Sequence, residues 1–378
     1  MAGAPALVFR IASNPRQKAM PNHQVFLIHG MGNFAPNWAG PIKAAIRQTF
    51  NAYPRVAALG LADRFDFVEV TYNDVFDKWR KLWRDDAQSA AAAATALNLD
   101  SSAANQLVSL ARSASGNSFF QTHVLDVALY RYLRQFSEEV DQSVRTQILE
   151  RLNTFPAGQL PPWSAIAHSL GSAVLHNSLQ AMFTQRVGGV ALGDAYMPVN
   201  LFMVANVGKV LWNKGGDFYM SKVRPHGAQA VGFCTRYANF DHALDPFTHV
   251  DPFDPPPEWF PPDLARAQVF SQVSIARDDV QQLNVHGLSH YWSHPEVHVG
   301  IIRGLLDIPG VISNTERDAA LAAWRAHRLA NQAGAAAQAR LMALLARQLQ
   351  PWGQVVERLF DFRDAVLDAG LDPRDGET

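Results

Sequence analysis

Short apolar runs alternate with longer helix-like runs along much of the chain. The apolar or Phe- and Val-rich runs predict buried strands at residues 25–28, 65–72, 163–167, 187–192, 230–237 and 269–275. Helices are predicted between some of them, at residues 36–50 and 170–183. Because strands that alternate with helices are typical of a parallel sheet covered by helices, we predict an α/β fold with a mostly parallel sheet.

The alternation stops between residues 73 and 161, where the pattern is almost entirely helical. Within it, residues 124–152 are predicted to form a helix layer over the sheet, and residues 77–118 a helical insertion that is the better candidate for a lid. Residues 251–263 hold six of the 22 prolines. Proline restricts the backbone, so we interpret this stretch as a stiff surface loop inside the domain rather than a proline-rich ligand.

The C-terminal part has a different pattern from the rest of the chain. Residues 311–378 are helical in pattern, and Ser313 and Glu316 have the spacing of a capping box at a helix start. We therefore predict a main domain at residues 1–310 and a C-terminal helical extension at residues 311–378. The extension is expected to pack on the main domain or on a second copy, which would give a homo-oligomer.

Composition narrows the class of protein. Of 378 residues, 48% are hydrophobic and 18% charged, so a large core is possible and general disorder is excluded. The net charge of -1 gives no overall attraction to nucleic acid. No apolar run is long enough for a transmembrane helix and no signal peptide is evident, so a cytoplasmic location is expected unless export is signal-independent. The one cysteine, Cys234, lies in an apolar run and is predicted to be buried core.

The stretch Ala167-His168-Ser169-Leu170-Gly171 is the most informative motif. It lies between a predicted strand and a predicted helix, and it matches G-x-S-x-G with alanine in place of the first glycine. A serine at such a turn projects its hydroxyl clear of the sheet, and the following helix directs its N–H groups toward it. Ser169 is therefore the candidate nucleophile.

A glycine turn after the first predicted strand has the pattern of an oxyanion loop. His29-Gly30-Met31-Gly32 follows residues 25–28, and the glycines would let the amide of Met31 face Ser169. The amide of Leu170 is the second candidate donor. Without Ser169, the same turn would indicate only a structural turn with a buried histidine.

Two aspartates and four histidines compete for the remaining roles. Asp241 and Asp245 both follow the strand predicted to end at residue 237, and Asp245 precedes a proline. The histidines stand four residues apart, at His286, His290, His294 and His298. Pro295 breaks a continuous helical stripe, so we predict one catalytic histidine and no metal site. His286 lies beside a flexible glycine, whereas Tyr291 and Trp292 can anchor the loop of His290.

Serine, then acid, then histidine is the chain order of α/β-hydrolases, and the sequence resembles lipase- and esterase-like bacterial serine hydrolases of that superfamily. The matching segments are His29 to Gly32, Ala167 to Gly171, Asp245-Pro246 and His290-Tyr291-Trp292, and Asp126 and Tyr130 resemble a helix preceding the nucleophile strand. The resemblance implies Asp245 as the acid, His290 as the base, ester hydrolysis through an acyl-enzyme and no cofactor.

Lipid-like acyl esters are the first expectation for the substrate, because four aromatic residues offer an apolar surface: Trp79, Trp83, Phe119 and Phe120. These residues serve equally well to pack helices together. A thioesterase or acyltransferase would use the same serine. The sequence is also compatible with a non-catalytic scaffold on a hydrolase fold, which a phosphonate probe would not label at Ser169, and with an exported lipase toxin, which an immunity-type partner would bind.

Overall fold

The sheet and its covering helices lie within the part of the chain that the computed structural model describes. That part comprises residues 22–32, 34, 36–60, 64–85, 126–127, 130–131, 133–156, 158–184, 196–228, 232–249, 251–281 and 285–327.

Six strands form one sheet in which every pairing is parallel, in the order β2-β1-β3-β4-β5-β6. The strands are β1 His23–Ile28, β2 Phe65–Val70, β3 Trp163–His168, β4 Asn200–Val204, β5 Arg236–His242 and β6 Phe270–Ile275. All the strands run the same way, so their carboxyl ends share one edge of the sheet. The chain order reverses between β1 and β3, the position at which ligands bind in open parallel sheets.

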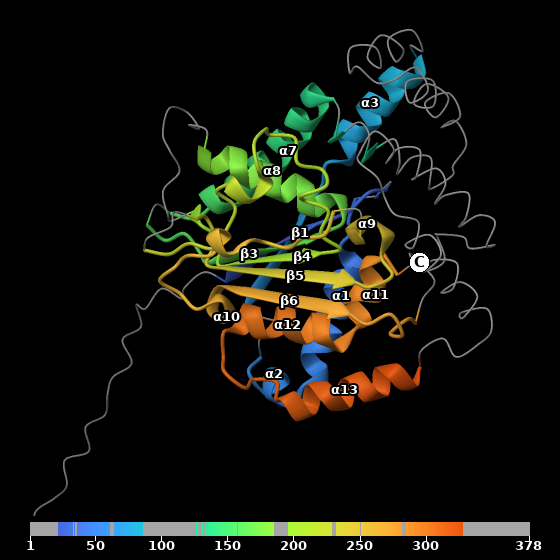
Figure 1. Cartoon of the computed structure of the whole chain (residues 1–378), viewed down its shortest axis with the longest axis vertical. Coiled ribbons are helices and arrows are strands. Elements are labelled where there is room, and N and C mark those ends of the chain that lie inside the picture. Colours follow the sequence, from blue (N-terminus) through green and yellow to red (C-terminus); the bar gives the residue numbers. More distant parts are fainter. Residues whose placement is uncertain are drawn as a thin grey trace, which may run out of the picture.

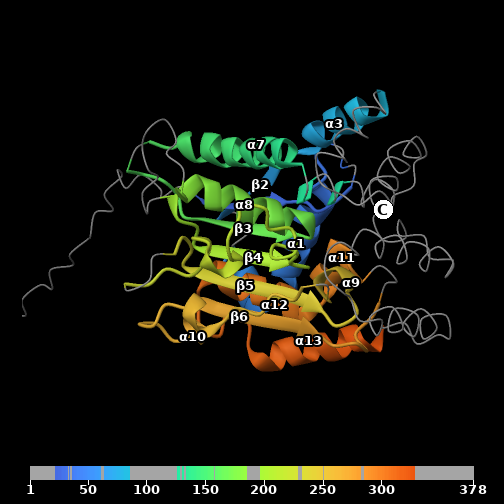
Figure 2. The same cartoon turned by 45° about the horizontal axis from the view of Figure 1, so that its top comes forward.

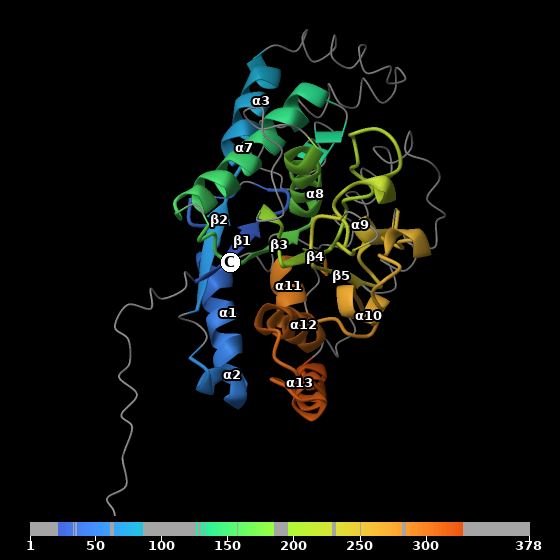
Figure 3. The ribbon, with the colours of Figure 1, turned by 90° about the vertical axis from the view of Figure 1, so that its left-hand side faces the viewer.

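Helices cover both faces of the sheet (Figure 1). On one face lie α3 Asn73–Asp85, α7 Arg134–Asn153 and α8 Leu170–Thr184. On the other lie α1 Gly40–Ala52, α2 Pro54–Ala58, α12 Pro295–Leu306 and α13 Asn314–Ala326, as Figures 2 and 3 show from two further directions. The described residues also contain five short elements: η3 Phe218–Met220, α9 Pro246–His249, η4 Pro257–Trp259, α10 Arg266–Val269 and α11 Leu288–Ser293.

Each face of the sheet has its own core, because side chains alternate along each strand. In β1, Phe26 and Ile28 belong to the core beneath α7 and α8, whereas Val25 and Leu27 belong to the core above α1 and α12. Both sets are buried, which explains why β1 appears in the sequence as an unbroken apolar run.

The predicted α/β class and parallel sheet are confirmed, with corrections to individual strands. Residues 25–28, 65–72, 163–167 and 269–275 correspond to β1, β2, β3 and β6. The prediction at 187–192 lies outside the described residues, and β4 was not predicted. The prediction at 230–237 ends where β5 begins, because Cys234 forms only an isolated bridge with Pro225 before the strand starts at Arg236.

The helical predictions are borne out in part: α1 and α7 are present, but Leu133 is extended before α7 begins at Arg134, and the described residues from 154 to 161 are not helical. The predicted helix at 36–50 is α1, which starts four residues later with Pro41 in its first turn. Helix α7 lies over the sheet, as predicted for residues 124–152. Of the insertion at 77–118, residues 86–118 lie outside the described residues.

Two aromatic side chains of the proline-rich loop are buried, and the capping box predicted near residue 313 is present. Phe253 and Trp259 anchor the loop by burying their rings against Tyr237 of β5, at centroid separations of 5.0 and 5.3 Å. Ser313 and Glu316 form the predicted capping box at the start of α13. Residues 328–378 lie outside the described residues.

Two further observations bear on the predictions from composition. Cys234 is fully buried, so its interpretation as core is confirmed. Among the helices of the described ranges, none is long and apolar enough to cross a bilayer.

Candidate active site

Ser169 occupies a tight turn between β3 and α8. Its φ of 53° lies in the left-handed region, which a residue with a side chain adopts only when its surroundings enforce it. Its amide donates to the carbonyl of Val204 in β4 at 2.9 Å, and its carbonyl accepts from the amide of Ser172 at 2.8 Å and from the Ser172 hydroxyl at 2.6 Å. The turn is therefore fixed on both sides.

Two glycines allow the segments around this turn to approach each other. A Cβ on Gly171 would stand 2.2 Å from the carbonyl oxygen of His29, so the first turn of α8 passes directly against the end of β1. A Cβ on Gly30 would stand 2.8 Å from the Cβ of Ser169. Position 171 therefore requires glycine because the end of β1 passes directly against it.

A hydrogen-bonded chain joins Ser169, His286 and Asp245 at the carboxyl edge of the sheet. Nε2 of His286 lies 2.6 Å from Oγ of Ser169, and Nδ1 of His286 lies 2.8 Å from Oδ2 of Asp245. A carboxylate only accepts, so Nδ1 carries the proton and Nε2 accepts from the serine hydroxyl. Ser169 follows β3, Asp245 lies between β5 and α9, and His286 lies between β6 and α11. Figure 1 shows α9 and α11 at the carboxyl ends of the strands.

Asp245 is fully buried and accepts hydrogen bonds from several groups. Besides His286, the hydroxyl of Tyr291 donates to Oδ2 at 2.9 Å and the amide of Phe247 donates to Oδ1 at 3.0 Å. Burial alone would raise the pKa of this carboxyl, but attraction to His286 and these hydrogen bonds outweigh it and hold the pKa below its usual value. Asp241, the competing carboxylate, instead accepts from Gln272 and Asn239 on the strands themselves.

The expectation that His290 stands between Ser169 and Asp245 is wrong, because His286 occupies that position. The reason is local: Gly287 is the N-cap of α11, so His286 lies on the turn facing β3 while His290 is carried into the helix. The His290 ring is fully buried, 5.2 Å from the ring of His242 and 6.0 Å from that of Trp324 in α13. Within the described ranges, neither of its ring nitrogens has a hydrogen-bond partner.

The other regularly spaced histidines contact different neighbours. His298 donates from Nδ1 to the carbonyl of Trp292 at 2.9 Å and accepts at Nε2 from the hydroxyl of Tyr53 at 2.8 Å. Nε2 of His294 lies 3.5 Å from Oδ2 of Asp279. In the part of the chain that the structure describes, no three metal-ligating side chains converge.

Tyr72 fixes the loop that carries Met31 through the two carbonyls before Met31. The Tyr72 hydroxyl donates to the carbonyl of His29 at 2.6 Å and contacts that of Gly30 at 3.2 Å, while Nδ1 of His29 donates to the Gly30 carbonyl at 2.8 Å. In a planar trans peptide the N–H points away from the preceding carbonyl. The amide of Met31 therefore points away from Tyr72. The amide of Leu170 lies in the first turn of α8, where N–H groups have no acceptor within the helix.

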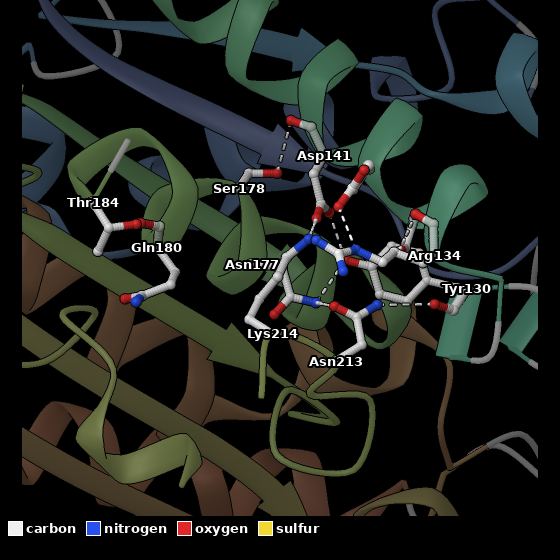
Figure 4. Close-up of polar contacts among 11 residues, drawn as sticks. Tyr130, Arg134, Asp141, Asn177, Ser178, Gln180, Thr184, Asn213 and Lys214 are labelled. Atoms are coloured by element: carbon white, nitrogen blue, oxygen red, sulfur yellow. Dashed lines mark hydrogen bonds and ion pairs between the residues drawn. The ribbon is translucent and has the colours of Figure 1, made fainter. Parts of the chain in front are cut away.

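Asp126 and Tyr130, which the resemblance singled out, belong to two polar clusters, and Asp126 accepts a hydrogen bond from the backbone of Gly32 in the loop that carries Met31. Asp126 is buried and pairs with Arg80 of α3 at 2.9 Å. Figure 4 shows the second cluster, in which the Tyr130 hydroxyl donates to Asp141 at 2.6 Å and Lys214 pairs with the same carboxylate at 2.6 Å. These contacts join α7 and α8 to the loop after β4, and we assign them a structural part.

Of the four aromatic residues proposed as an acyl surface, Trp79 has a side chain that the structure describes. Trp79 lies in α3, where its Nε1 donates to Glu139 of α7 at 2.9 Å and its ring meets Phe136 edge-on at 5.8 Å. It thus packs one helix on another. Phe119 and Phe120 lie outside the described residues, as does the side chain of Trp83.

The chain was compared with known proteins at three levels. No protein-family model, no curated protein and no solved structure matches it.

Proposed function

We propose that this protein is a serine hydrolase of the α/β-hydrolase type that cleaves carboxylic esters through an acyl-enzyme on Ser169. The observation that carries the proposal is the hydrogen-bonded chain from Asp245 through His286 to Ser169. The three residues come from three separate segments, after β3, β5 and β6, and Ser169 lies at the end of β3, one of the two strands between which the sheet order reverses.

In the proposed first step, Oγ of Ser169 attacks the ester carbonyl carbon and its proton moves to Nε2 of His286. Asp245 keeps Nδ1 protonated and stabilises the imidazolium that forms. The amides of Leu170 and Met31 would hold the negative oxygen. Each such donor contributes roughly 3–4 kcal/mol to stabilising the transition state in enzymes that use one.

In the second step, the tetrahedral intermediate expels the alcohol, which takes the proton from His286. Water then attacks the acyl-enzyme while His286 accepts its proton. The second tetrahedral intermediate breaks the ester bond to Ser169 as His286 returns that proton to Oγ, and the acid product is released. The chain's own residues supply every proton transfer in this sequence. Lipid-like acyl esters remain the proposed substrate class.

The direct test is labelling with a serine-directed fluorophosphonate, followed by mapping of the modified residue. Ser221 offers a matched control, because its hydroxyl also lies 2.9 Å from a histidine nitrogen, Nε2 of His176, but the other nitrogen of His176 meets no carboxylate in the described ranges. We expect labelling of the wild type and of Ser221→Ala, but not of Ser169→Ala.

Turnover of nitrophenyl esters of increasing chain length gives the second readout. Ser169→Ala should lower kcat by about 10⁴-fold or more while leaving the melting temperature near that of the wild type. Equal activity of Ser169→Ala and wild type would refute the proposal. Faster reaction with thioesters than with matched esters would reassign the substrate class while keeping the same nucleophile.

A further inference from the structure

We propose that His168 is a positioning residue that tethers the backbone of His286 to the end of β3. This inference rests on the proposed function, since it assigns His168 a part in holding the base. The observation behind it is a contact separate from the hydrogen bonds that join Ser169, His286 and Asp245: Nε2 of His168 lies 2.7 Å from the carbonyl oxygen of His286. A carbonyl only accepts, so His168 is the donor.

His168 is well suited to act as a fixed point. It is the last residue of β3 and pairs in register with Val204 of β4 in the middle of the sheet. Its side chain is buried, with the ring 5.2 Å from the His286 ring and 6.4 Å from that of Tyr291. The donor therefore belongs to a strand that is paired on both sides, and it directly precedes the proposed nucleophile.

His286 needs such a tether because it belongs to no helix or strand. It lies on a turn before the N-cap of α11, where the backbone can shift more freely than in a sheet. Its ring is held at two points, by Ser169 and Asp245, and the His168 contact adds a third point on the backbone. Ring and main chain together then determine where Nε2 stands relative to the serine.

The tether adds no charge beside the imidazolium that forms on His286. Burial, and secondarily the nearby His286, lower the pKa of His168 to about 3. The His168 ring therefore stays neutral, and its Nε2 stays a donor, at the neutral and mildly alkaline pH values at which esterases are assayed. A positively charged donor at this position would oppose protonation of the base.

Two substitutions separate the hydrogen bond from the bulk of the ring. His168→Leu fills the space without a donor, whereas His168→Gln places an amide N–H at a comparable distance. His176→Leu is the control, because it also removes a buried histidine with one hydrogen bond, here to Ser221, from a position on α8 outside the reacting chain. All three variants are measured at equal folded concentration.

We expect His168→Leu to lower kcat for a nitrophenyl ester roughly 10- to 100-fold with little change in KM, since misplacing a reacting group by about 1 Å has effects of that size. His168→Gln should recover most of this loss and His176→Leu should retain wild-type kcat. Wild-type kcat in His168→Leu, or an equal loss in the Gln and Leu variants, would overturn the inference.

A second readout does not depend on turnover. The proton on Nδ1 of His286, shared with Asp245, should give a low-field proton NMR signal in the wild type and in His168→Gln, and a broadened or absent one in His168→Leu. An unchanged signal in His168→Leu would overturn the tether. If the wild type neither reacts with fluorophosphonate nor hydrolyses esters, the proposed function fails, and this signal still decides whether His168 holds His286.

Discussion

Replacing His290 with leucine should make the protein more resistant to acid without harming the Ser169 site. His290 is fully buried and, within the described ranges, neither ring nitrogen has a hydrogen-bond partner. Burial, followed by the proximity of His242 and His294, lowers its pKa to about 3. The native protein thus keeps this ring neutral, whereas the unfolded chain binds a proton at the ordinary histidine pKa of about 6.5.

The size of the effect follows from proton linkage. Between pH 6.5 and pH 3 the unfolded state holds one more proton at this residue than the native state, so native stability falls as the pH falls. Each pH unit in this window costs about 1.4 kcal/mol per residue. At pH 5, His290 therefore destabilises the wild type by about 2 kcal/mol relative to pH 8. His290→Leu removes that loss.

The assay is urea denaturation of wild type and variant at pH 8 and pH 5. The difference in the free energy of unfolding between the two proteins should grow by about 2 kcal/mol in favour of the variant at the lower pH. His176→Leu is the comparison: burial also lowers the pKa of His176 to about 3, so the same increment is expected. At pH 8 the free energy of unfolding of His176→Leu should be lower than that of the wild type, because the Ser221 hydroxyl loses its hydrogen bond to His176.

A constant difference between His290→Leu and wild type at the two pH values would refute this reasoning, because it would mean that the native ring takes up a proton as readily as the unfolded one. The same variant tests the position of the base. His290→Leu should retain turnover and fluorophosphonate labelling, whereas His286→Leu should lose both. Loss of turnover in folded His290→Leu would return the base to His290.

The remaining predictions concern the carboxylate and metal. Asp245→Asn should lower kcat by about 10⁴-fold, and Asp241→Asn should have a much smaller effect; the reverse ranking would make Asp241 the acid. Tyr291→Phe should lower kcat about 10- to 100-fold with little change in KM, from the 1.5–3 kcal/mol typical of hydrogen bonds to charged groups; unchanged kcat would show that the hydroxyl is dispensable. Prolonged chelation should leave activity intact, and a loss that zinc or calcium reverses would establish a metal requirement.

β1 and β3 show how an interior parallel strand is recognised in the sequence, because both faces of each strand are buried. Both are short runs of apolar residues, which is the pattern of an interior parallel strand. Burial alone does not decide the outcome, since β4 is equally buried and was not predicted, whereas β2 and β6 were predicted although some of their residues are not buried. β5 is harder, because Arg236, Asn239 and Asp241 interrupt its apolar pattern. Asn239 is buried because its polar atoms are paired with Asn206 and Asp241, so a polar residue occupies a position in the strand that an apolar pattern does not reveal.

The candidate site divides in the same way between local and long-range information. Ser169 and the glycines beside it are readable because one turn imposes its requirements on adjacent residues. The choice between His286 and His290 depends on where α11 begins, and four-residue spacing does not reveal that. The signal that could have decided it is Gly287 before the aromatic run Tyr291-Trp292: it is an N-cap, so the histidine before it stays on the turn and the one after it enters the core.

The burial of Asp245 supports the proposal that the hydrogen bonds joining Asp245, His286 and Ser169 do more than stabilise the fold. A buried carboxylate is costly, and a well-packed apolar residue in its place is often equally or more stabilising. Here Asp245 is completely buried and is kept ionised by hydrogen-bond donors from three residues. One of these donors, His286, also contacts Ser169, whose backbone is in the left-handed region. Stability alone would be served better by removing the charge and relaxing the turn. Their combination at the point where the sheet order reverses is what we expect of a site shaped by chemistry.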